Sequence, residues 1–279
     1  MIDGRTEIYG VIGHPIAHTS SPALHNAAFG AEGMNASYAA FDVAPESLGE
    51  AISGMRALNI RGLNVTVPHK EKIIRYLDGV VGEAALLRSV NVVDNKGGRL
   101  TGYNTDVEGF KRSLEHAGVN VAGEKIVVLG AGGAARSVVR ALELGGAGEI
   151  AVVNRTHEKA ESLAAESAAR GGRTKAVSFS SQDGYNILRD CAIIVNATSV
   201  GLRPGDGAPL DTEMLNGGHT LVDLIYKPPL SEFLAAGAAR GARTLNGFGM
   251  LVFQAMEAFR IWTGRTPRMD VMWDAGTEG

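Results

Sequence analysis

Cysteine is almost absent from this chain, since Cys191 stands alone among 279 residues. A lone cysteine cannot form an internal disulfide, and the amino terminus "MIDGRTEIYGVIG" lacks the basic and apolar regions of a signal peptide, so we expect a cytoplasmic protein. Cys191 precedes the apolar run "AIIVNAT" and has no ligand partners for a metal. We therefore expect a small buried side chain there and no metal site.

An excess of positive charge and a long apolar run are missing as well. The chain has 27 Lys and Arg residues, which are scattered, and 30 Asp and Glu residues, which gives a net charge of -3. It therefore lacks the positive electrostatic field that attracts nucleic acid. No apolar run approaches the ~20 residues that a membrane span requires. With 45% hydrophobic and 20% charged residues, the composition is that of a globular protein whose partner we expect to be a small molecule, not a nucleic acid or a membrane.

The first part of the chain alternates short apolar runs with longer amphipathic stretches, which predicts an α/β domain over residues 1–106. A hairpin is expected where two strand-like runs flank "KGG", with Asn95 and both glycines suited to positive φ. The strands expected here cover residues 7–13, 37–43, 63–68, 90–95 and 99–104, and the helices 21–33 and 45–58.

A second series of strands begins at Lys125 and predicts a parallel sheet within residues 107–246. After it, apolar residues recur at helical spacing over 247–264, so residues 247–279 are expected to form a helical segment. The strands expected in the second domain cover residues 125–130, 149–154, 175–179, 192–198 and 219–226.

The string "GAGGAAR" follows the first strand of this second series. Gly130, Gly132 and Ala135 fill the pattern G-x-G-x-x-G/A between a strand and a helix, with another strand about twenty residues on. In this pattern the first glycine allows a tight turn, the second lets backbone approach a pyrophosphate, and the third residue permits close helix packing. The alternative is an ordinary glycine turn of a βαβ unit, but the context favours a Rossmann-type dinucleotide site.

The end of the next strand predicts which dinucleotide is bound. An NAD site usually has Asp or Glu there, whereas this strand ends in Asn154, Arg155 and Thr156, with Lys159 one helical turn later. Guanidinium, ammonium, amide and hydroxyl groups are suited to a 2′-phosphate. We therefore predict NADP(H); the alternative is that Arg155 is a solvated loop cation.

"LNVTVPHKEK" raises a separate question, because Lys70 follows Pro68 at the carboxyl end of a strand, where ligands of open α/β sheets collect. A lysine held by a carboxylate can exchange a proton with a substrate oxygen. Asp106 in "GYNTDVEGF" is the candidate carboxylate, although Thr105 or Asp106 could equally serve as a helix cap.

Several polar residues near these two candidates suit a hydroxylated acid. Thr19, Ser20 and Ser21 precede Pro22 at a helix amino end, and Asn64 and Thr66 lie two apart on one strand. Each also has a structural explanation: a helix cap for Ser21, a β-branched strand residue for Thr66 and a turn former for Asn91. His14 shows no metal-ligand pattern, and we expect His69 on the surface or on a cleft wall.

The chain resembles the shikimate dehydrogenase family along nearly its whole length. The resemblance rests on "GHPIAHTSSPALHN", "NVTVPHK", "NTD", "GAGGAAR", "NRT", "NATSVG" and "NGFGMLVFQ", which occur in the family's order. It implies a substrate domain, an NADP domain of Rossmann type and a last helix that returns to the first domain. It also implies that Lys70 and Asp106 act together in the NADPH-dependent reduction of 3-dehydroshikimate.

The same resemblance assigns the binding residues. The substrate would contact Thr19, Ser21, Asn64, Thr66, Asn91, Tyr226 and Gln254. The cofactor would contact Gly130, Ala131, Gly132, Gly133, Ala134, Asn154, Arg155, Thr156, Lys159, Gly247 and Met250.

Two departures from the family pattern bear on the substrate. Thr19 stands where serine is usual, and "LLRSVNVV" introduces Arg88 and Ser89 near Asn91. A small change of shape shifts discrimination by ~1–3 kcal/mol, which leaves quinate and aminoshikimate open as substrates. A silent NADPH-binding regulator is the alternative of another class, and a tetrahydrofolate dehydrogenase fits the serine-rich box poorly. Monomer and homodimer are both compatible with the sequence.

Overall fold

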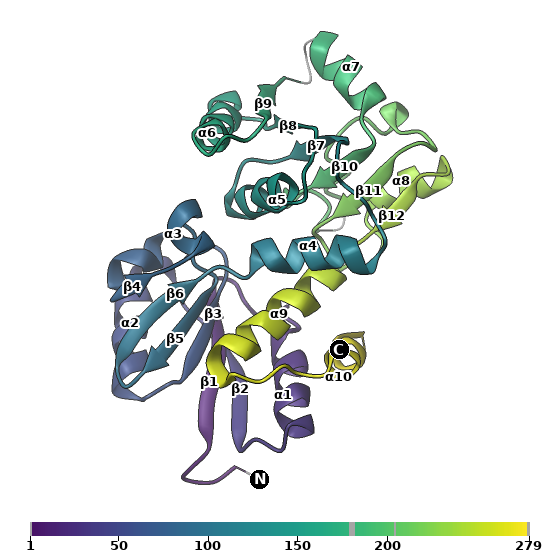
Figure 1. The fold of residues 1–279 in the computed structure, drawn as a ribbon. Helices are drawn as coiled ribbons and strands as arrows, with labels where there is room; N and C mark the ends of the chain where they lie inside the picture. The colour runs from purple at the N-terminus through teal and green to yellow at the C-terminus, as the bar shows by residue number, and fades with distance from the viewer. Residues whose placement is uncertain (1, 179–181, 204, 278–279) are drawn as a thin grey trace. The chain divides into compact units, whose positions relative to one another are not determined.

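The computed structural model describes residues 2–178, 182–203 and 205–277. Contacts divide the chain into two compact units: unit 1 joins the residues up to Gly109 with those from Leu251 onward, and unit 2 is Phe110–Met250. Both units are α/β, as predicted (Figure 1). The functional boundaries that we expected after residues 106 and 246 stay predictions.

Unit 1 contains a mixed sheet with the order β2-β1-β3-β5-β6-β4. β1 is parallel to β2 and β3, β5 is antiparallel to β3 and β6, and β4 is parallel to β6. The strands are β1 (Glu7–Gly13), β2 (Ala36–Asp42), β3 (Gly62–Val65), β4 (Gly79–Val80), β5 (Val92–Lys96) and β6 (Arg99–Tyr103).

The predicted hairpin is confirmed, with one correction. Gly97 and Gly98 have φ of 63° and 88°, as a tight hairpin turn requires, but Asn95 is paired with Leu100 within the strands and does not have positive φ. Its side chain instead donates to the Ile60 carbonyl and accepts from the Gly98 amide, both at 2.9 Å. Asn95 therefore stabilises the turn through its side chain.

The two faces of this sheet bury different side chains. Because neighbours along a strand point to opposite faces, Leu63 and Val65 join Ile52 and Met55 in an aliphatic core, while Gly62 and Asn64 face the other way. The helices of unit 1 are α1 (Ser21–Ala31), α2 (Leu48–Ala57), α3 (Glu83–Leu87), most of α9 (Phe248–Thr263) and α10 (Met269–Thr277), with 3-10 turns η1 (Pro45–Ser47) and η2 (Lys72–Tyr76).

The second face explains why the carboxyl-terminal helix packs in unit 1. The Trp262 indole of α9 donates to the Val93 carbonyl at 3.0 Å, and its ring lies 5.3 Å from Tyr9. A Cβ at Gly62 would lie 2.4 Å from the Trp262 Nε1, so only glycine permits this approach. The predicted return of the last helix to the first part of the chain is therefore present.

Unit 2 contains a sheet in which every strand is parallel, in the order β12-β11-β10-β7-β8-β9. Numbered within the unit, this is 3-2-1-4-5-6 read from β9, the order of dinucleotide-binding folds. The strands are β7 (Lys125–Leu129), β8 (Glu149–Val153), β9 (Thr174–Val177), β10 (Ile193–Asn196), β11 (Thr220–Asp223) and β12 (Arg243–Leu245). The strand predicted over 175–179 ends at Val177, and its last residue, Phe179, lies outside the described residues.

The helices of unit 2 connect these strands, and α4 (Asp106–His116) leads into the unit. They are α5 (Gly133–Leu144), α6 (His157–Ala168), α7 (Gln182–Asp190) and α8 (Glu232–Ala239), with a 3-10 turn η3 (Thr212–Met214). Cys191 is 5% exposed and belongs to the core of this unit, as predicted, and burial raises the pKa of its thiol to about 12.

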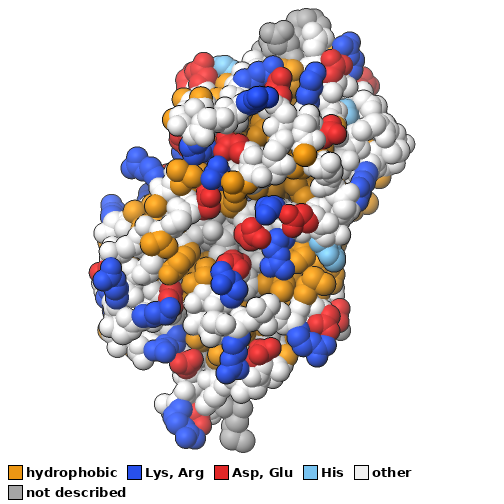
Figure 2. All heavy atoms as spheres, in the orientation of Figure 1, with side chains coloured by type: hydrophobic (Ala, Val, Ile, Leu, Met, Phe, Trp, Pro, Cys, Tyr) orange, Lys and Arg blue, Asp and Glu red, His pale blue; other side chains and the backbone are white. Residues whose placement is uncertain are grey.

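One face of the molecule matches the charge pattern of the sequence. On the face shown in Figure 2, Lys and Arg side chains are scattered among Asp and Glu side chains.

Over the ranges that the structure describes, no helix combines the length and apolar character of a membrane span. Within the same ranges, no group of three His, Cys, Asp or Glu side chains could hold a metal ion.

Candidate active site

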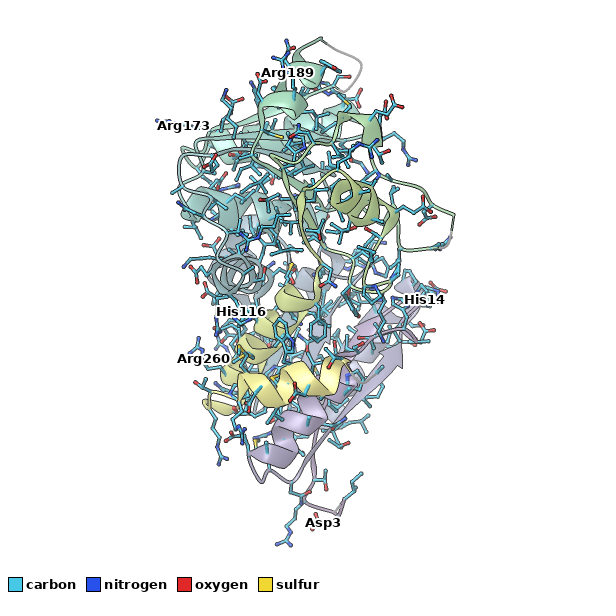
Figure 3. All side chains as sticks on the ribbon, turned by 90° about the vertical axis from the view of Figure 1, so that its right-hand side faces the viewer. Asp3, His14, His116, Arg173, Arg189 and Arg260 are labelled. Carbon is cyan, nitrogen blue, oxygen red and sulfur yellow. The ribbon has the colours of Figure 1, made fainter. Side chains whose placement is uncertain are left out.

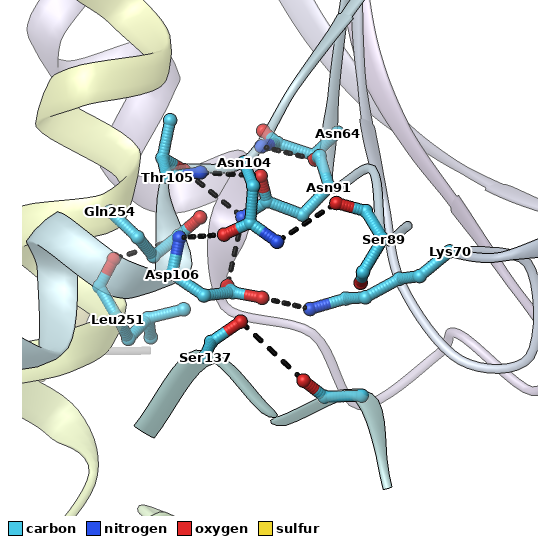
Figure 4. Close-up of polar contacts among 11 residues, drawn as sticks. Asn64, Lys70, Ser89, Asn91, Asn104, Thr105, Asp106, Ser137, Leu251 and Gln254 are labelled. Carbon is cyan, nitrogen blue, oxygen red and sulfur yellow. Dashed lines mark hydrogen bonds and ion pairs between the residues drawn. The ribbon is translucent and has the colours of Figure 1, made fainter. Parts of the chain in front are cut away.

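Lys70 and Asp106 form an ion pair in unit 1. The Lys70 Nζ lies 2.6 Å from the Asp106 Oδ2, and the two side chains are only 18% and 7% exposed (Figure 4). β3 ends at Val65, earlier than the predicted strand over 63–68, and the chain then turns through Pro68 to Lys70. The Lys70 carbonyl accepts from the Val90 amide at 2.8 Å, which anchors this turn. Two residues that are 36 positions apart are thus brought together.

The surroundings of Asp106 bear on whether it is a helix cap. It is the first residue of α4, and its Oδ1 accepts from the Asn91 Nδ2 at 2.8 Å while its Oδ2 accepts from Lys70. The Asp106 amide donates to the Asn104 Oδ1 at 3.0 Å, so Asn104 supplies a side-chain acceptor at this helix start. Both carboxylate oxygens of Asp106 therefore accept hydrogen bonds from side chains. The hydrogen-bonded residues around Asp106 are called the polar cluster below; they are Asn64, Lys70, Asn91, Asn104, Thr105 and Asp106.

Asn91 links three parts of this cluster. Its Oδ1 accepts from the Thr105 amide at 2.8 Å, and its Nδ2 also approaches the Thr105 Oγ1 at 3.0 Å. Its carbonyl accepts from the Asn64 Nδ2 at 3.3 Å. Asn91 is 2% exposed, so these bonds act away from water and fix the orientation of the Asp106 carboxylate.

The other polar residues predicted for the substrate lie in unit 1 at varied exposure. Asn64 is buried on β3, and Thr66 is half-buried just after this strand ends. Ser21 begins α1 and is buried; its hydroxyl accepts from the half-buried Thr19 Oγ1 at 3.2 Å. Ser20 is the residue before the helix, and its Oγ has no hydrogen-bond partner among the described residues.

Gln254 is placed by a close contact between α9 and α4. A Cβ at Gly109 would lie 2.7 Å from the Gln254 Cβ, so this glycine lets the two helices approach. Gly109 is three residues after Asp106, which puts Gln254 beside the same turn of α4 (Figure 4). The half-buried Gln254 side chain donates from its Nε2 to the Leu251 carbonyl at 2.8 Å.

The histidine predictions need one correction. His69 is 0% exposed, and its Nε2 lies 2.7 Å from the Val43 carbonyl, so the prediction of a surface or cleft-wall residue was wrong. The turn between Pro68 and Lys70 folds this side chain into the core of unit 1. His14 is exposed (Figure 3). Its Nδ1 lies 2.7 Å from the Asp42 Oδ1.

Arg88 and Ser89 have local roles. Arg88 ends α3 in the left-handed conformation, with φ of 51°, and is exposed. Ser89 is buried, and its carbonyl accepts from the Asn104 Nδ2 at 2.9 Å. The contribution of Ser89 to the cluster therefore runs through its backbone.

The glycine-rich turn of unit 2 has the geometry that its sequence predicts. Gly130 has φ of 106°, and a Cβ there would lie 3.0 Å from the Ala197 carbonyl oxygen. Gly132 precedes α5, and a Cβ there would meet no atom of the described residues within 4 Å, so these residues leave space beside the helix amino end. Gly133 begins the helix, and Ala135 is 0% exposed, as close packing requires. Ala131 is buried and Ala134 is half-buried.

The end of β8 carries polar and cationic groups. Asn154 is half-buried and donates from its Nδ2 to the Thr156 carbonyl at 2.8 Å. Arg155, Thr156 and Lys159 are exposed beside the start of α6. An open anion site at a helix amino end, followed by two exposed cations and no carboxylate at the strand end, fits NADP better than NAD.

The last predicted cofactor and substrate residues of unit 2 lie near the end of β11. The Gly247 amide donates to the Ile225 carbonyl at 3.1 Å, and a Cβ at Gly247 would lie 2.0 Å from the Leu224 carbonyl oxygen. Only glycine fits there. Tyr226 follows Ile225 directly and is half-buried, as is Met250 on the first turn of α9.

Two features were not anticipated from the sequence. Tyr38 on β2 donates from its hydroxyl to the Asn64 Oδ1 at 2.6 Å. In unit 2, buried Asp223 accepts from the Asn196 Nδ2 at 3.0 Å and from the Ser231 hydroxyl at 2.5 Å, and burial raises its pKa. Asn196 belongs to the family string "NATSVG", which was a signal for the second feature; Tyr38 gave none beyond its place in a strand.

Comparisons with known proteins identify the family. Three family models match: the shikimate dehydrogenase substrate binding domain over residues 11–93, shikimate / quinate 5-dehydrogenase over 112–202 and the shikimate 5'-dehydrogenase C-terminal domain over 247–275. The NADP(+) shikimate dehydrogenase of Symbiobacterium thermophilum is 44% identical over 96% of this chain and 93% of its own length.

Solved structures agree with the sequence relatives. A shikimate dehydrogenase in complex with NADP+ has a TM-score of 0.93 at 40% identity, with 100% of this chain and 97% of that chain covered. The Thermus thermophilus shikimate 5-dehydrogenase in complex with NADP(H) and shikimate has a TM-score of 0.88 at 37% identity, with 98% and 99% covered. The resemblance predicted from the motifs is confirmed, and the chain belongs to the shikimate dehydrogenase family.

Proposed function

We propose that this protein catalyses the reversible, NADP-dependent reduction of 3-dehydroshikimate to shikimate, a step of chorismate and aromatic amino acid biosynthesis. The observation that carries the proposal is the Lys70–Asp106 ion pair, 2.6 Å long and largely screened from water, after the carboxyl end of β3. Membership of the family and the glycine turn of unit 2 support the same reaction.

In the direction of reduction, the Lys70 ammonium donates a proton to the carbonyl oxygen of the substrate as that oxygen gains charge. Asp106 accepts a hydrogen bond from Lys70 and keeps the ammonium in one position, while Asn91 keeps the carboxylate from rotating. NADPH, when bound, supplies the hydride. In the reverse direction the Lys70 amine receives the proton of the substrate hydroxyl.

The remaining side chains of unit 1 would recognise the substrate. Thr19 and Ser21, at the amino end of α1, suit its carboxylate, because hydroxyls and a helix amino end both favour an anion. Asn64, Thr66, Asn91 and Gln254 would bind its hydroxyls. Tyr226, which belongs to unit 2, stays a predicted substrate contact. We assign substrate binding and catalysis to residues 1–106, NADP binding to 107–246, and to 247–279 a helical segment that returns to the substrate domain.

The cofactor contacts follow from the open turn of unit 2. The backbone of Gly130, Ala131, Gly132, Gly133 and Ala134 would lie against the pyrophosphate at the start of α5. Asn154, Arg155, Thr156 and Lys159 would bind the 2′-phosphate, and Gly247 and Met250 would lie near the nicotinamide.

Steady-state rates with shikimate and quinate, each with NADP and with NAD, test this function. We expect shikimate with NADP to give the highest kcat/KM. Faster turnover of quinate than of shikimate would favour a quinate dehydrogenase, the alternative that the extra methyl group of Thr19 leaves open. No change in NADPH absorbance with any cyclic polyol acid would contradict the function and favour a silent NADPH-binding regulator.

A further inference from the structure

Tyr38 reaches the polar cluster from the buried side of unit 1. It is 3% exposed, and its ring stacks on His25 at 4.4 Å with an interplanar angle of 11°. Its hydroxyl donates to the Asn64 Oδ1 at 2.6 Å, and Asn64 is itself 6% exposed. A core aromatic residue thus contacts a side chain of the candidate site.

This bond determines which way the Asn64 amide faces. With its oxygen toward Tyr38, its Nδ2 donates to the Asn91 carbonyl at 3.3 Å. A flipped amide would set its oxygen against the Asn91 carbonyl oxygen, and two buried acceptors facing each other are unfavourable. The phenol therefore holds the one orientation in which both amide groups are satisfied.

The same bonds connect Tyr38 to the reacting groups. The Asn91 carbonyl accepts a hydrogen bond from Asn64, and the Asn91 side chain donates one to Asp106 (Figure 4). Asp106 also accepts a hydrogen bond from Lys70. Every link of this chain lies in unit 1. A change in the Asn64 orientation would therefore be felt where the substrate binds and at the residue that orients Asp106.

Tyr38 and the His25 ring stacked on it are both neutral near pH 7. Burial raises the pKa of Tyr38 well above that of a free phenol, and a hydrogen bond with Ser21 only partly opposes this rise. Burial lowers the pKa of His25 to about 3, so the stacked imidazole carries no charge. The Tyr38 hydroxyl therefore keeps the proton that it donates to Asn64.

We propose that Tyr38 is a positioning residue that acts through Asn64, fixing the amide that binds a hydroxyl of the substrate. The inference rests on the proposed function, because it assumes that Asn64 contacts a cyclic polyol acid. It extends the site beyond the residues that the family motifs assign, into the core between α1 and the sheet.

Tyr38→Phe keeps the buried ring and removes only the hydroxyl. We expect kcat/KM for shikimate to fall about tenfold or more, mainly through a higher KM, because one buried hydrogen bond is lost and the Asn64 amide is released. The KM for NADP should not change. Tyr9→Phe is the matched control: Tyr9 is also 3% exposed and pairs with Tyr38 in register, but its hydroxyl bonds Glu7 at 3.2 Å.

A double-mutant cycle separates positioning from a structural role. If Tyr38 acts through Asn64, Tyr38→Phe should cost nothing further in an Asn64→Ala background, so the double variant should match Asn64→Ala. The comparison of the double variant with Asn64→Ala can still be made if Tyr38→Phe alone folds poorly. The double variant lacks the Asn64 Oδ1, so no buried acceptor is left without its Tyr38 donor. Equal losses for Tyr9→Phe and Tyr38→Phe, or a further tenfold loss in the double variant, would overturn the inference. An inactive wild-type protein would instead overturn the proposed function.

Discussion

The candidate sites of the two units are built in different ways. In unit 1 the site consists of side chains that hold one another: Lys70 on Asp106, Asp106 on Asn91, and Asn91 on Thr105. In unit 2 it consists mostly of backbone, with glycines that leave space at a helix amino end and cations that are exposed. Proton transfer needs an atom at a fixed place, whereas a pyrophosphate needs room and amide donors.

This difference implies that substitutions in the two units should have separable effects. A change in the polar cluster of unit 1 should lower turnover. A change in the glycine turn or at Arg155 should raise the KM or lower the kcat/KM for NADP.

Lys70→Ala should have the largest effect. Loss of the proton donor should lower kcat for shikimate oxidation by a factor on the order of 10² to 10⁴, with the KM for NADP nearly unchanged. Steady-state kinetics followed by NADPH absorbance measure both parameters. Lys72→Ala, which removes an exposed lysine on η2, is the control and should retain wild-type turnover. Wild-type kcat in Lys70→Ala would show that the role is misassigned.

Gly132→Ala should weaken cofactor binding without disturbing the fold. A methyl group there meets no atom within 4 Å in the part of the chain that the structure describes, and the backbone has φ of -89°, so the melting temperature should not fall. The methyl group would occupy the space of the pyrophosphate, and the KM for NADP should rise about 10- to 100-fold. Gly30→Ala in α1, which also adds a methyl group in open space, controls for the substitution itself. An unchanged KM for NADP would argue against pyrophosphate binding at this turn.

Arg155→Ala should reduce the preference for NADP. We expect kcat/KM with NADP to fall about 10- to 30-fold, because a charged hydrogen bond to the 2′-phosphate is lost, and kcat/KM with NAD to change little. Arg189→Ala, which removes another exposed arginine of unit 2, should leave both values as in the wild type. Equal losses with both cofactors would mean that Arg155 does not recognise the phosphate.

Thr19→Ser should have the smallest effect. It keeps the hydroxyl and removes the methyl group, so the ratio of kcat/KM for shikimate to that for quinate should shift by less than about tenfold. Competition between the two substrates measures this ratio. Ser47→Ala, outside both sites, provides the comparison, and a ratio that does not move in Thr19→Ser would remove Thr19 from substrate discrimination.

The sequence predicts the backbone site more completely than the side-chain site. Gly130 and Gly132 can be interpreted from their spacing and local context, because the strand, turn and helix that form this turn are adjacent in the chain. The pairing of Lys70 with Asp106 depends on a fold that joins residues 36 positions apart, and spacing left a helix cap equally open. The polar residues near Lys70 and the resemblance to a family favoured the pairing over the helix cap.

The errors have physical causes. His69 follows a proline and precedes a charged run, which is typical of an exposed turn, but the Val43 carbonyl offers it a buried partner. Tyr38 could not be distinguished from an ordinary strand tyrosine, because its bond to Asn64 crosses from β2 to β3 past β1. Such contacts depend on tertiary packing and leave no local trace in the sequence.

A titration of Lys70→Ala and Gly132→Ala with NADPH, read by cofactor fluorescence on samples whose turnover is already known, separates proton transfer from cofactor binding. Lys70→Ala should bind NADPH with wild-type affinity although it barely turns over. Gly132→Ala should bind NADPH weakly and still reach near wild-type rates at saturating cofactor. If Lys70→Ala lost NADPH affinity in proportion to its activity, the assignment of proton transfer to Lys70 and of cofactor binding to the glycine turn would be contradicted.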